Sequence, residues 1–173
     1  MSRDWFGFMT IPLVVTISLV AAVSAGYRLN TTPSLPLGLY RETKEPVRRG
    51  MFATFCLEDT AFIRLAKERG YLGEGPCPGG IKPLGKEIFG LPSDEICLND
   101  GLITVNGKTI ALTKAKATDS HGRAMPIPQL KSGVIPKGYA LLLSPRHAGG
   151  FDSRYFGLVR LSSLHPVRPV CTW

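Results

Sequence analysis

The sequence predicts a mainly β (α+β) domain with one or two short helices, preceded by an N-terminal transmembrane helix. Glycine and proline are frequent, with 19 and 14 of the 173 residues, which favours short strands joined by many turns. Asn106-Gly107 lies between two β-branched segments and predicts a tight hairpin turn. No charged residue occurs from Trp5 to Tyr27, and this length is enough to cross the apolar core of a bilayer as a helix.

The N-terminal segment, residues 1–28, is compatible with two fates. Its uncharged run is longer than the apolar part of a usual secretory signal, which favours a retained membrane anchor. Small residues at 23–25 would also suit a signal that is cleaved after export. In either case residues 29–173 form one exported domain, which is long enough to bury a hydrophobic core.

In the first half of this domain, short apolar runs predict strands joined by turns. A helix is predicted from 60 to 69, because Phe62, Leu65 and Ala66 share one face and Gly70 provides a stop. Glycine and proline predict a loop at 73–80. The predicted strands cover residues 39–40, 50–55, 86–89 and 95–98.

In the second half, the hairpin joins residues 102–105 and 108–112, because Asn-Gly accepts the positive φ angles of a type I′ turn. Apolar runs predict a buried strand at 139–143 and another strand at 158–161. The tail, residues 166–173, is predicted as an edge strand, since its prolines cannot donate to a sheet ladder.

The net positive charge bears on whether the domain binds nucleic acid or anionic lipid. The net charge is +8, and its basic residues are scattered without the interleaved aromatic side chains of a nucleic-acid-binding stripe. We therefore expect no nucleic acid as partner. A basic domain tethered to a bilayer is instead attracted to anionic lipid head groups.

The four cysteines fit an oxidising compartment, and they permit three pairings. We expect Cys56–Cys77, because this bridge would close a segment bounded by glycine and proline, which leaves Cys97–Cys171 by elimination. Neither the cysteines nor the dispersed histidines show the short spacing of a zinc site. The sequence therefore predicts neither a metal nor a cofactor.

Ser34 follows the apolar span closely and is the candidate nucleophile. A serine hydroxyl is a poor nucleophile unless a neighbouring base removes its proton. His147 and Asp152 would complete a Ser-His-Asp triad, but the glycine-rich surroundings of His147 suit an exposed loop histidine. Lysine is a base only if burial lowers its pKa, about 10.4 in model peptides, by several units. Lys86 is the candidate, because in a strand it would share an apolar face with Ile88.

Three segments, in this order along the chain, resemble the membrane-bound Ser/Lys signal peptidases and most closely their TraF-type branch, which matures pilin precursors in bacterial conjugation. The first, residues 30–40, has the asparagine and threonine ahead of the serine and the proline and Gly-Leu-Tyr after it. The second, residues 86–94, keeps the spacing of the family's lysine box but has Glu87 in place of arginine and Ser93 in place of glycine. The third, residues 152–157, resembles the family's last box. One departure is Gly150, where many relatives carry a serine that orients the lysine.

The resemblance implies the roles of the site residues. Ser34 would be the nucleophile and Lys86 the base, with Lys82 as the second candidate because it has the same strand parity but breaks the spacing to the aspartate of the box. The Ser34 amide and the Thr32 hydroxyl would stabilise the oxyanion. Architectural roles in the walls of the site would fall to Asp152, Arg154 and Asp94.

The resemblance also implies a serine endopeptidase that cleaves a membrane-inserted pilin precursor after small side chains. Its place would be the outer face of the bacterial inner membrane, with the domain in the periplasm, or the soluble periplasm after signal removal. Either water or the amino terminus of the substrate could resolve the acyl-enzyme, which leaves hydrolysis and cyclisation both open. Other proteins of the conjugation apparatus are further expected partners. The alternative is a non-catalytic assembly component of a conjugation (type IV secretion) apparatus.

Overall fold

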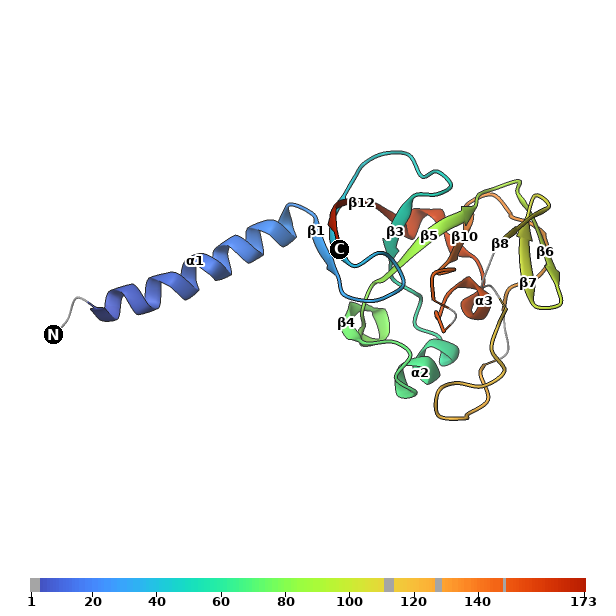
Figure 1. Cartoon of the computed structure of the whole chain (residues 1–173), viewed down its shortest axis with the longest axis horizontal. Coiled ribbons are helices and arrows are strands. Elements are labelled where there is room, and N and C mark those ends of the chain that lie inside the picture. Colours follow the sequence, from blue (N-terminus) through green and yellow to red (C-terminus); the bar gives the residue numbers. More distant parts are fainter. Residues whose placement is uncertain (1–3, 111–113, 127–128, 148) are drawn as a thin grey trace.

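The computed structural model describes residues 4–110, 114–126, 129–147 and 149–173, with side chains from residue 12 onward (Figure 1). Helix α1 (Asp4–Ser24) projects away from a body built on two antiparallel sheets. In the part of the chain that is described, no helix combines the length and the apolar character needed to cross a membrane. The transmembrane helix stays a prediction.

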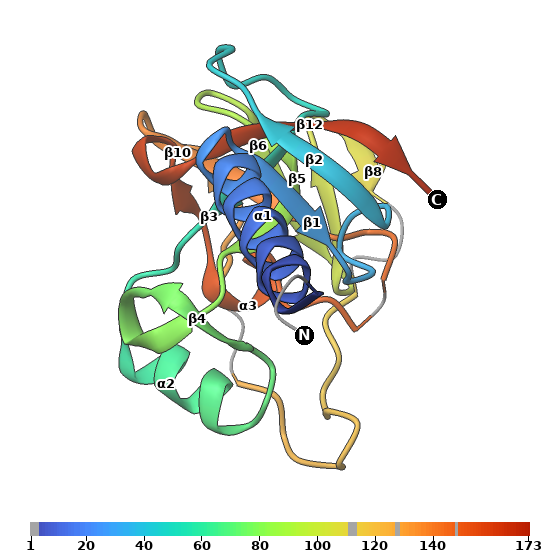
Figure 2. The same cartoon turned by 90° about the vertical axis from the view of Figure 1, so that its left-hand side faces the viewer.

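The larger sheet has seven strands, and most of the predicted strands lie in it. It begins at Tyr27, so the strand ladder starts inside the segment predicted as residues 1–28. In the view along α1 (Figure 2), α2 and β4 lie at the lower left of the body, and β2 and β12 lie at its upper right. In spatial order its strands are β1 (Tyr27–Asn30), β2 (Gly38–Glu42), β12 (His165–Thr172), β3 (Phe52–Phe55), β5 (Leu84–Gly90), β10 (Tyr139–Leu143) and β11 (Val159–Arg160).

The smaller sheet has four strands and contains the predicted hairpin. Asn106 and Gly107 have φ angles of 50° and 76°, which confirms the turn that their sequence predicts. Residues 111 and 112 of the predicted second hairpin strand lie outside the described residues. In spatial order the strands are β8 (Lys108–Ile110), β7 (Leu102–Val105), β6 (Glu95–Asn99) and β9 (Gly133–Val134).

The prediction that the tail is an edge strand was wrong, because β12 lies inside the larger sheet between β2 and β3. Its first residues, from His165, pair with β3, and its residues from Val167 onward pair with β2. Val167 is the residue that pairs on both sides. Each proline therefore needs to serve a ladder on one side at most, which explains how a proline-containing strand occupies an interior position.

Two short helices complete the domain, as predicted. The first, α2 (Ala61–Glu68), is capped by the hydroxyl of Thr60, which accepts a hydrogen bond of 3.2 Å from the Ile63 amide. The second, α3 (Ser153–Phe156), has Asp152 as its cap and was not predicted from periodicity. The predicted loop at 73–80 contains a short strand, β4 (Glu74–Cys77), and a 3₁₀ turn, η1 (Pro78–Gly80). A second 3₁₀ turn, η2 (Leu161–Ser163), precedes β12.

The predicted Cys56–Cys77 disulfide is present. The second predicted pairing is wrong, because Cys97 and Cys171 are free and exposed. Cys97 belongs to β6 in the smaller sheet, whereas Cys171 belongs to β12 in the larger one. Figure 1 shows β6 and the C-terminus at opposite ends of the body, so elimination failed because it assumed that every cysteine is paired.

Strand β10 joins the two parts of the hydrophobic core. Leu142 packs into a cluster with Ile88, α2 and α3, while Leu141 and Leu143 pack against the smaller sheet. Leu142 pairs with Ile88 of β5 across the larger sheet. Core side chains on both faces therefore fix the strand pair β5–β10, and this pair carries the candidate base.

Candidate active site

Strand β5 places Lys86 in the interior of the domain. Its side chains alternate between buried and half-buried, and Leu84, Lys86 and Ile88 share the buried face. This confirms the face predicted from strand parity. Only 3% of the Lys86 side chain is exposed. A lysine this deeply buried is rare in proteins unless it is paired or functional.

Burial lowers the pKa of Lys86 to about 8, whereas the Asp152 carboxylate raises it and the Arg154 guanidinium lowers it. The dominant cause is the loss of water around the ammonium group, which disfavours the charged form. A pKa near 8 leaves a substantial neutral fraction at neutral to mildly alkaline pH. The buried position therefore gives Lys86 the property that a general base requires.

The hydroxyl of Ser34 lies directly at this amine. The Lys86 Nζ donates to the Ser34 Oγ over 2.9 Å, although 52 residues separate them. Ser34 is half-buried in the loop between β1 and β2. This is hydrogen-bonding distance for the transfer of the serine proton to the amine.

Asn30 shapes the loop that carries Ser34, a role for which the sequence alone gave no physical reason. Its Nδ2 donates to the carbonyl oxygens of Thr32, Leu35 and Pro36 over 2.9, 3.0 and 3.0 Å. Its Oδ1 accepts from the amide and the hydroxyl of Thr32. The Thr32 hydroxyl, predicted to serve the oxyanion, is exposed and donates to Asn30 over 2.9 Å. One side chain thus holds both ends of the nucleophile loop.

Asp152 and Arg154 form a fully buried ion pair at the start of α3. Arg154 Nε donates to Asp152 Oδ1 over 2.7 Å, and its Nη2 donates to Oδ2 over 2.9 Å. The Ser144 amide donates to the same Oδ2 over 2.8 Å, and the Gly150 carbonyl accepts from Arg154 Nη2. A planar guanidinium on a carboxylate gives a rigid fork. This ion pair fixes the loop from Ser144 to Asp152 beside Lys86.

A cleft of about 820 Å³ opens over the Ser34–Lys86 contact. Lys82 and His147 both line it. Among the described residues, however, the side-chain hydrogen bond of Ser34 is with Lys86. The arrangement therefore favours Lys86 over Lys82 and over a His147 triad as the base. Gly150 and Phe151, which directly precede the last box, and Tyr155 within it form part of the wall.

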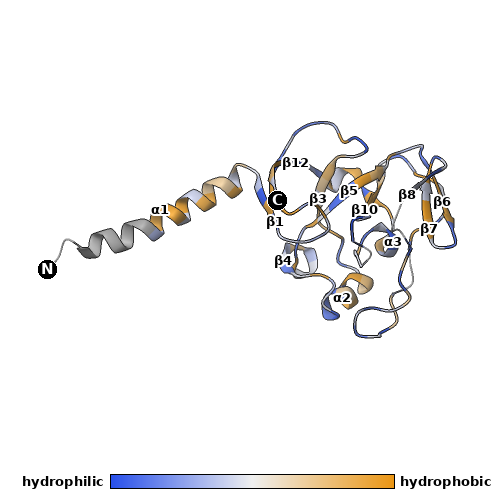
Figure 3. Ribbon diagram, viewed as in Figure 1, coloured by the Kyte–Doolittle hydropathy of each residue, from blue (hydrophilic) through white to orange (hydrophobic). Residues whose placement is uncertain are grey.

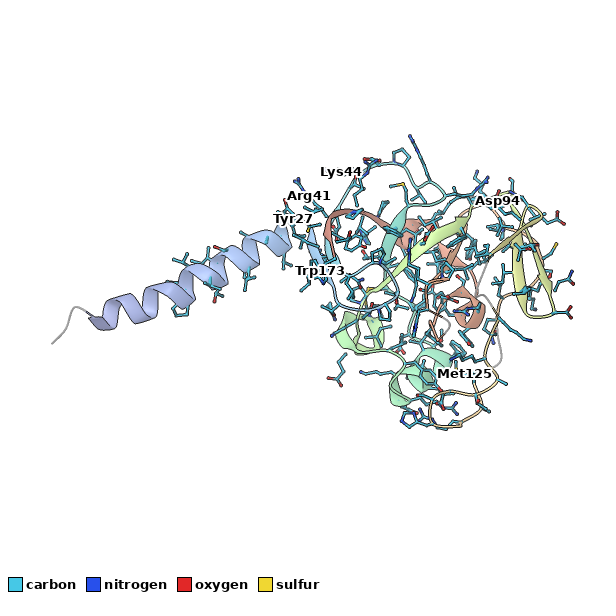
Figure 4. All side chains as sticks on the ribbon, in the orientation of Figure 1. Tyr27, Arg41, Lys44, Asp94, Met125 and Trp173 are labelled. Carbon is cyan, nitrogen blue, oxygen red and sulfur yellow. A yellow bond between two sulfur atoms is a disulfide. The ribbon has the colours of Figure 1, made fainter. Side chains whose placement is uncertain are left out.

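Asp94, which was expected in the walls of the active site, lies outside the cleft. Its carboxylate accepts from the Leu91 amide and from Asn106 Nδ2, each over 2.8 Å, and it pairs with Arg49 at 2.9 Å. Figure 4 shows Asp94 at the end of the body opposite α1. It stabilises the turn after β5, and it does not line the cleft over Ser34. The turn also explains the family's glycine, because Ser93 has a φ of 74°.

Comparison with known proteins agrees with the geometry. The model of the family "Signal peptidase, peptidase S26" matches residues 2–173. A plasmid transfer protein TraF of Escherichia coli is 38% identical over 151 residues, which cover 87% of this chain and 85% of that protein. A conjugal transfer protein TraF of Agrobacterium fabrum is 40% identical over 164 residues, which cover 93% of this chain and 91% of that protein.

Among solved structures, a signal peptidase I from Enterococcus faecalis V583 aligns with a TM-score of 0.41 and 19% identity, covering 73% of this chain and 99% of that one. The family assignment rests on the sequence matches, which extend over nearly the whole chain and include all three motif segments. With a serine and a buried lysine in contact beneath an open cleft, this chain belongs to the signal peptidase family, peptidase S26.

Proposed function

We propose that this chain is a Ser/Lys endopeptidase of conjugative transfer that processes a membrane-inserted pilin precursor at the outer face of the inner membrane. The observation that carries the proposal is the 2.9 Å contact between the Ser34 hydroxyl and the buried amine of Lys86. The transfer context comes from the names of the TraF relatives.

The proposed reaction is acyl transfer. Neutral Lys86 accepts the proton of the Ser34 hydroxyl while the Ser34 Oγ attacks the scissile carbonyl. The resulting oxyanion accepts from the Ser34 amide, which donates no hydrogen bond to a described residue, and from the Thr32 hydroxyl once it leaves Asn30. The Lys86 ammonium then protonates the leaving amine, and the substrate remains as an ester on Ser34.

The second half of the reaction decides the product. Attack on the ester by water releases a cut chain, whereas attack by the substrate's own amino terminus releases a cyclic one. In both cases Lys86 accepts a proton from the attacking group and returns one to the Ser34 Oγ. We propose small side chains before the cut, as signal peptidases usually select.

Membrane association is supported by the surface around α1. The described turns of α1 are apolar and exposed, with Leu13, Ile17 and Val20 each about 60% accessible (Figure 3). Where α1 meets the body, the Arg41 guanidinium lies over the Tyr27 ring, 5.4 Å from its centre (Figure 4). An apolar segment beside basic and aromatic side chains suits a boundary between lipid tails and head groups. Ser34 follows β1 directly, so a substrate bond emerging at this depth would reach it.

The test is mass spectrometry of the pilin from donor cells that carry the wild type, Ser34→Ala or Lys86→Ala. We expect unprocessed precursor in both variants, and Lys82→Ala, the matched control in the same cleft, to process normally. A mature mass lower than the cut chain by one water would identify cyclisation. Normal pilin in both Ser34→Ala and Lys86→Ala cells would refute the peptidase and leave the assembly component.

A further inference from the structure

The hydroxyl of Ser144 is a buried polar group that has no role in the mechanism described above. Ser144 has no measurable exposure, and its Oγ has no hydrogen-bond partner among the described residues. An unpartnered buried hydroxyl has lost its hydrogen bonds to water without replacement, which destabilises the fold. Such groups are uncommon in native structures and often mark a function.

Strand register brings this hydroxyl toward Lys86. Leu142 pairs with Ile88 and Leu143 with Glu87, and continuing this register by one residue beyond the end of β10 would set Ser144 against Lys86. Directly opposed residues of antiparallel strands place their side chains on the same face, with Cβ atoms about 5 Å apart. That face is the buried one, because Lys86 and Ile88 share it. The flexible lysine chain can therefore direct its amine to Ser144.

The place of Ser144 also accounts for Gly150. A Cβ built on Gly150 would lie 3.0 Å from the Ser144 Cβ and 3.4 Å from the Arg154 Nη2. A serine at position 150 would thus crowd the space that the Ser144 side chain fills. By the resemblance of the last box, the lysine-orienting serine of the signal peptidases would stand at this position. The chain has a glycine there and a serine on the neighbouring strand.

We propose that Ser144 is the positioning residue for Lys86 and that its hydroxyl replaces the serine missing at position 150. The inference rests on the proposed function. In the free protein Lys86 donates to Ser34. When the Ser34 Oγ attacks the scissile carbonyl, this oxygen becomes bonded to carbon and, until the amine leaves, Lys86 carries the transferred proton. The Ser144 Oγ then accepts a hydrogen bond from the ammonium and keeps it aimed at the leaving amine. The Ser144 amide, held by Asp152, fixes the residue for this contact.

The experiment compares the full-length wild type, Ser144→Ala and the double variant Ser144→Gly/Gly150→Ser in detergent, with 4-nitrophenyl acetate as the probe. Release of nitrophenolate reports acylation of Ser34, and Ser34→Ala gives the background. An isotope-edited NMR titration of the lysine amines, assigned with Lys86→Met, reports the pKa of Lys86 without any substrate.

For Ser144→Ala we expect acylation slower by about tenfold, as for the loss of one aligning contact. Because the hydroxyl accepts from the charged amine, its removal should lower the pKa of Lys86, by up to about one unit. The unfolding midpoint should stay equal or rise, because an unpartnered polar atom is removed. The double variant should recover part of the rate.

The matched control is Ser153→Ala. Ser153 is equally buried, but its hydroxyl accepts from the Leu142 amide over 3.1 Å. Its loss should lower the unfolding midpoint without moving the pKa of Lys86.

Wild-type rate and pKa in Ser144→Ala would overturn the proposal, and so would a slower rate explained by a lower unfolding midpoint. Equal acylation rates in Ser144→Ala and the double variant would overturn the idea that a serine hydroxyl can orient Lys86 from either position 144 or position 150. A nitrophenolate signal that survives in Ser34→Ala would instead count against the peptidase itself, which separates the two failures.

Discussion

The Ser34 Oγ and the Lys86 Nζ lie 2.9 Å apart because the loop after β1 packs on strand β5. Leu35, next to the nucleophile, is buried, and its Cδ1 lies 3.0 Å from where a Cβ of Gly85 would stand. Gly85 is next to the base. Packing of Leu35 on Gly85 thus brings together their sequence neighbours, Ser34 and Lys86. The contact is set by packing of neighbours and does not depend on the two reactive groups alone.

The pH dependence of processing tests the state of Lys86. The rate should rise with pH through a midpoint near 8, because burial lowers the pKa of Lys86 to about 8 and the neutral amine is the base. Below the midpoint the rate should fall about tenfold per pH unit. Initial rates of precursor cleavage between pH 6 and 10 measure this. A rate that does not change between pH 6 and 10 would contradict Lys86 as the base.

Lys86→Met should stabilise the protein at pH 7. Because the folded pKa, about 8, lies below the model value of 10.5, the folded state binds fewer protons than the unfolded state, and wild-type stability rises between these two pH values. Below pH 8 the deficit amounts to roughly 3 kcal/mol, and methionine removes it. Urea unfolding at pH 7 and pH 10.5 measures the gain in the free energy of unfolding and shows whether the variant's stability depends less on pH than that of the wild type. Exposed Lys82→Met should stay within about 0.5 kcal/mol of wild type, and an equal gain there would contradict burial as the cause.

Asp152→Asn should destabilise the domain by about 3–5 kcal/mol, because it leaves the buried Arg154 without its counter-charge. The new amide group would also face the donors of Arg154 and Ser144. The measurement is the free energy of unfolding in urea. Glu58→Gln breaks an exposed ion pair with Arg160 and should change stability by less than about 1 kcal/mol. Similar losses in both variants would show that burial of the ion pair is unimportant.

Asn30→Ala should slow processing on the order of 100-fold while the domain remains folded. It removes five hydrogen bonds between one side chain and the nucleophile loop, and misplacement of a reacting atom by an ångström has an effect of this size. The processing rate measures the loss of activity, and near-UV circular dichroism shows whether the domain remains folded. Asn99→Ala, an exposed asparagine in β6, is the control. Unchanged processing would mean that packing of Leu35 alone orders the loop.

Loss of the disulfide, in Cys56→Ala/Cys77→Ala, should lower the free energy of unfolding by about 3 kcal/mol, the chain-entropy value for a loop of this length. The closed segment contains α2 and Tyr71, which lines the cleft. Thermal unfolding of oxidised protein measures the effect. Cys97→Ser/Cys171→Ser should be neutral, because both thiols are free and exposed. A loss of stability in that control would indicate that Cys97 and Cys171 form a disulfide after all.

Local chemistry determined much of the chain from sequence. The Asn106-Gly107 turn, the helix predicted at 60–69 and the buried face of Lys86 each depend on neighbours within a few residues. Backbone preferences and strand parity act over this range, and therefore they are readable in the sequence. The motif order located Ser34 and Lys86 as candidates, and the last box located Asp152 with Arg154.

Tertiary structure alone decided which distant groups meet. It placed β12 inside the sheet, left Cys97 and Cys171 in separate sheets and set Asp94 outside the cleft. It also buried the Ser144 hydroxyl without a hydrogen-bond partner among the described residues. These outcomes depend on strand order and register, which arise from burying many side chains at once. No single segment of the sequence contains that information, because each pairing is selected by the packing of the whole core.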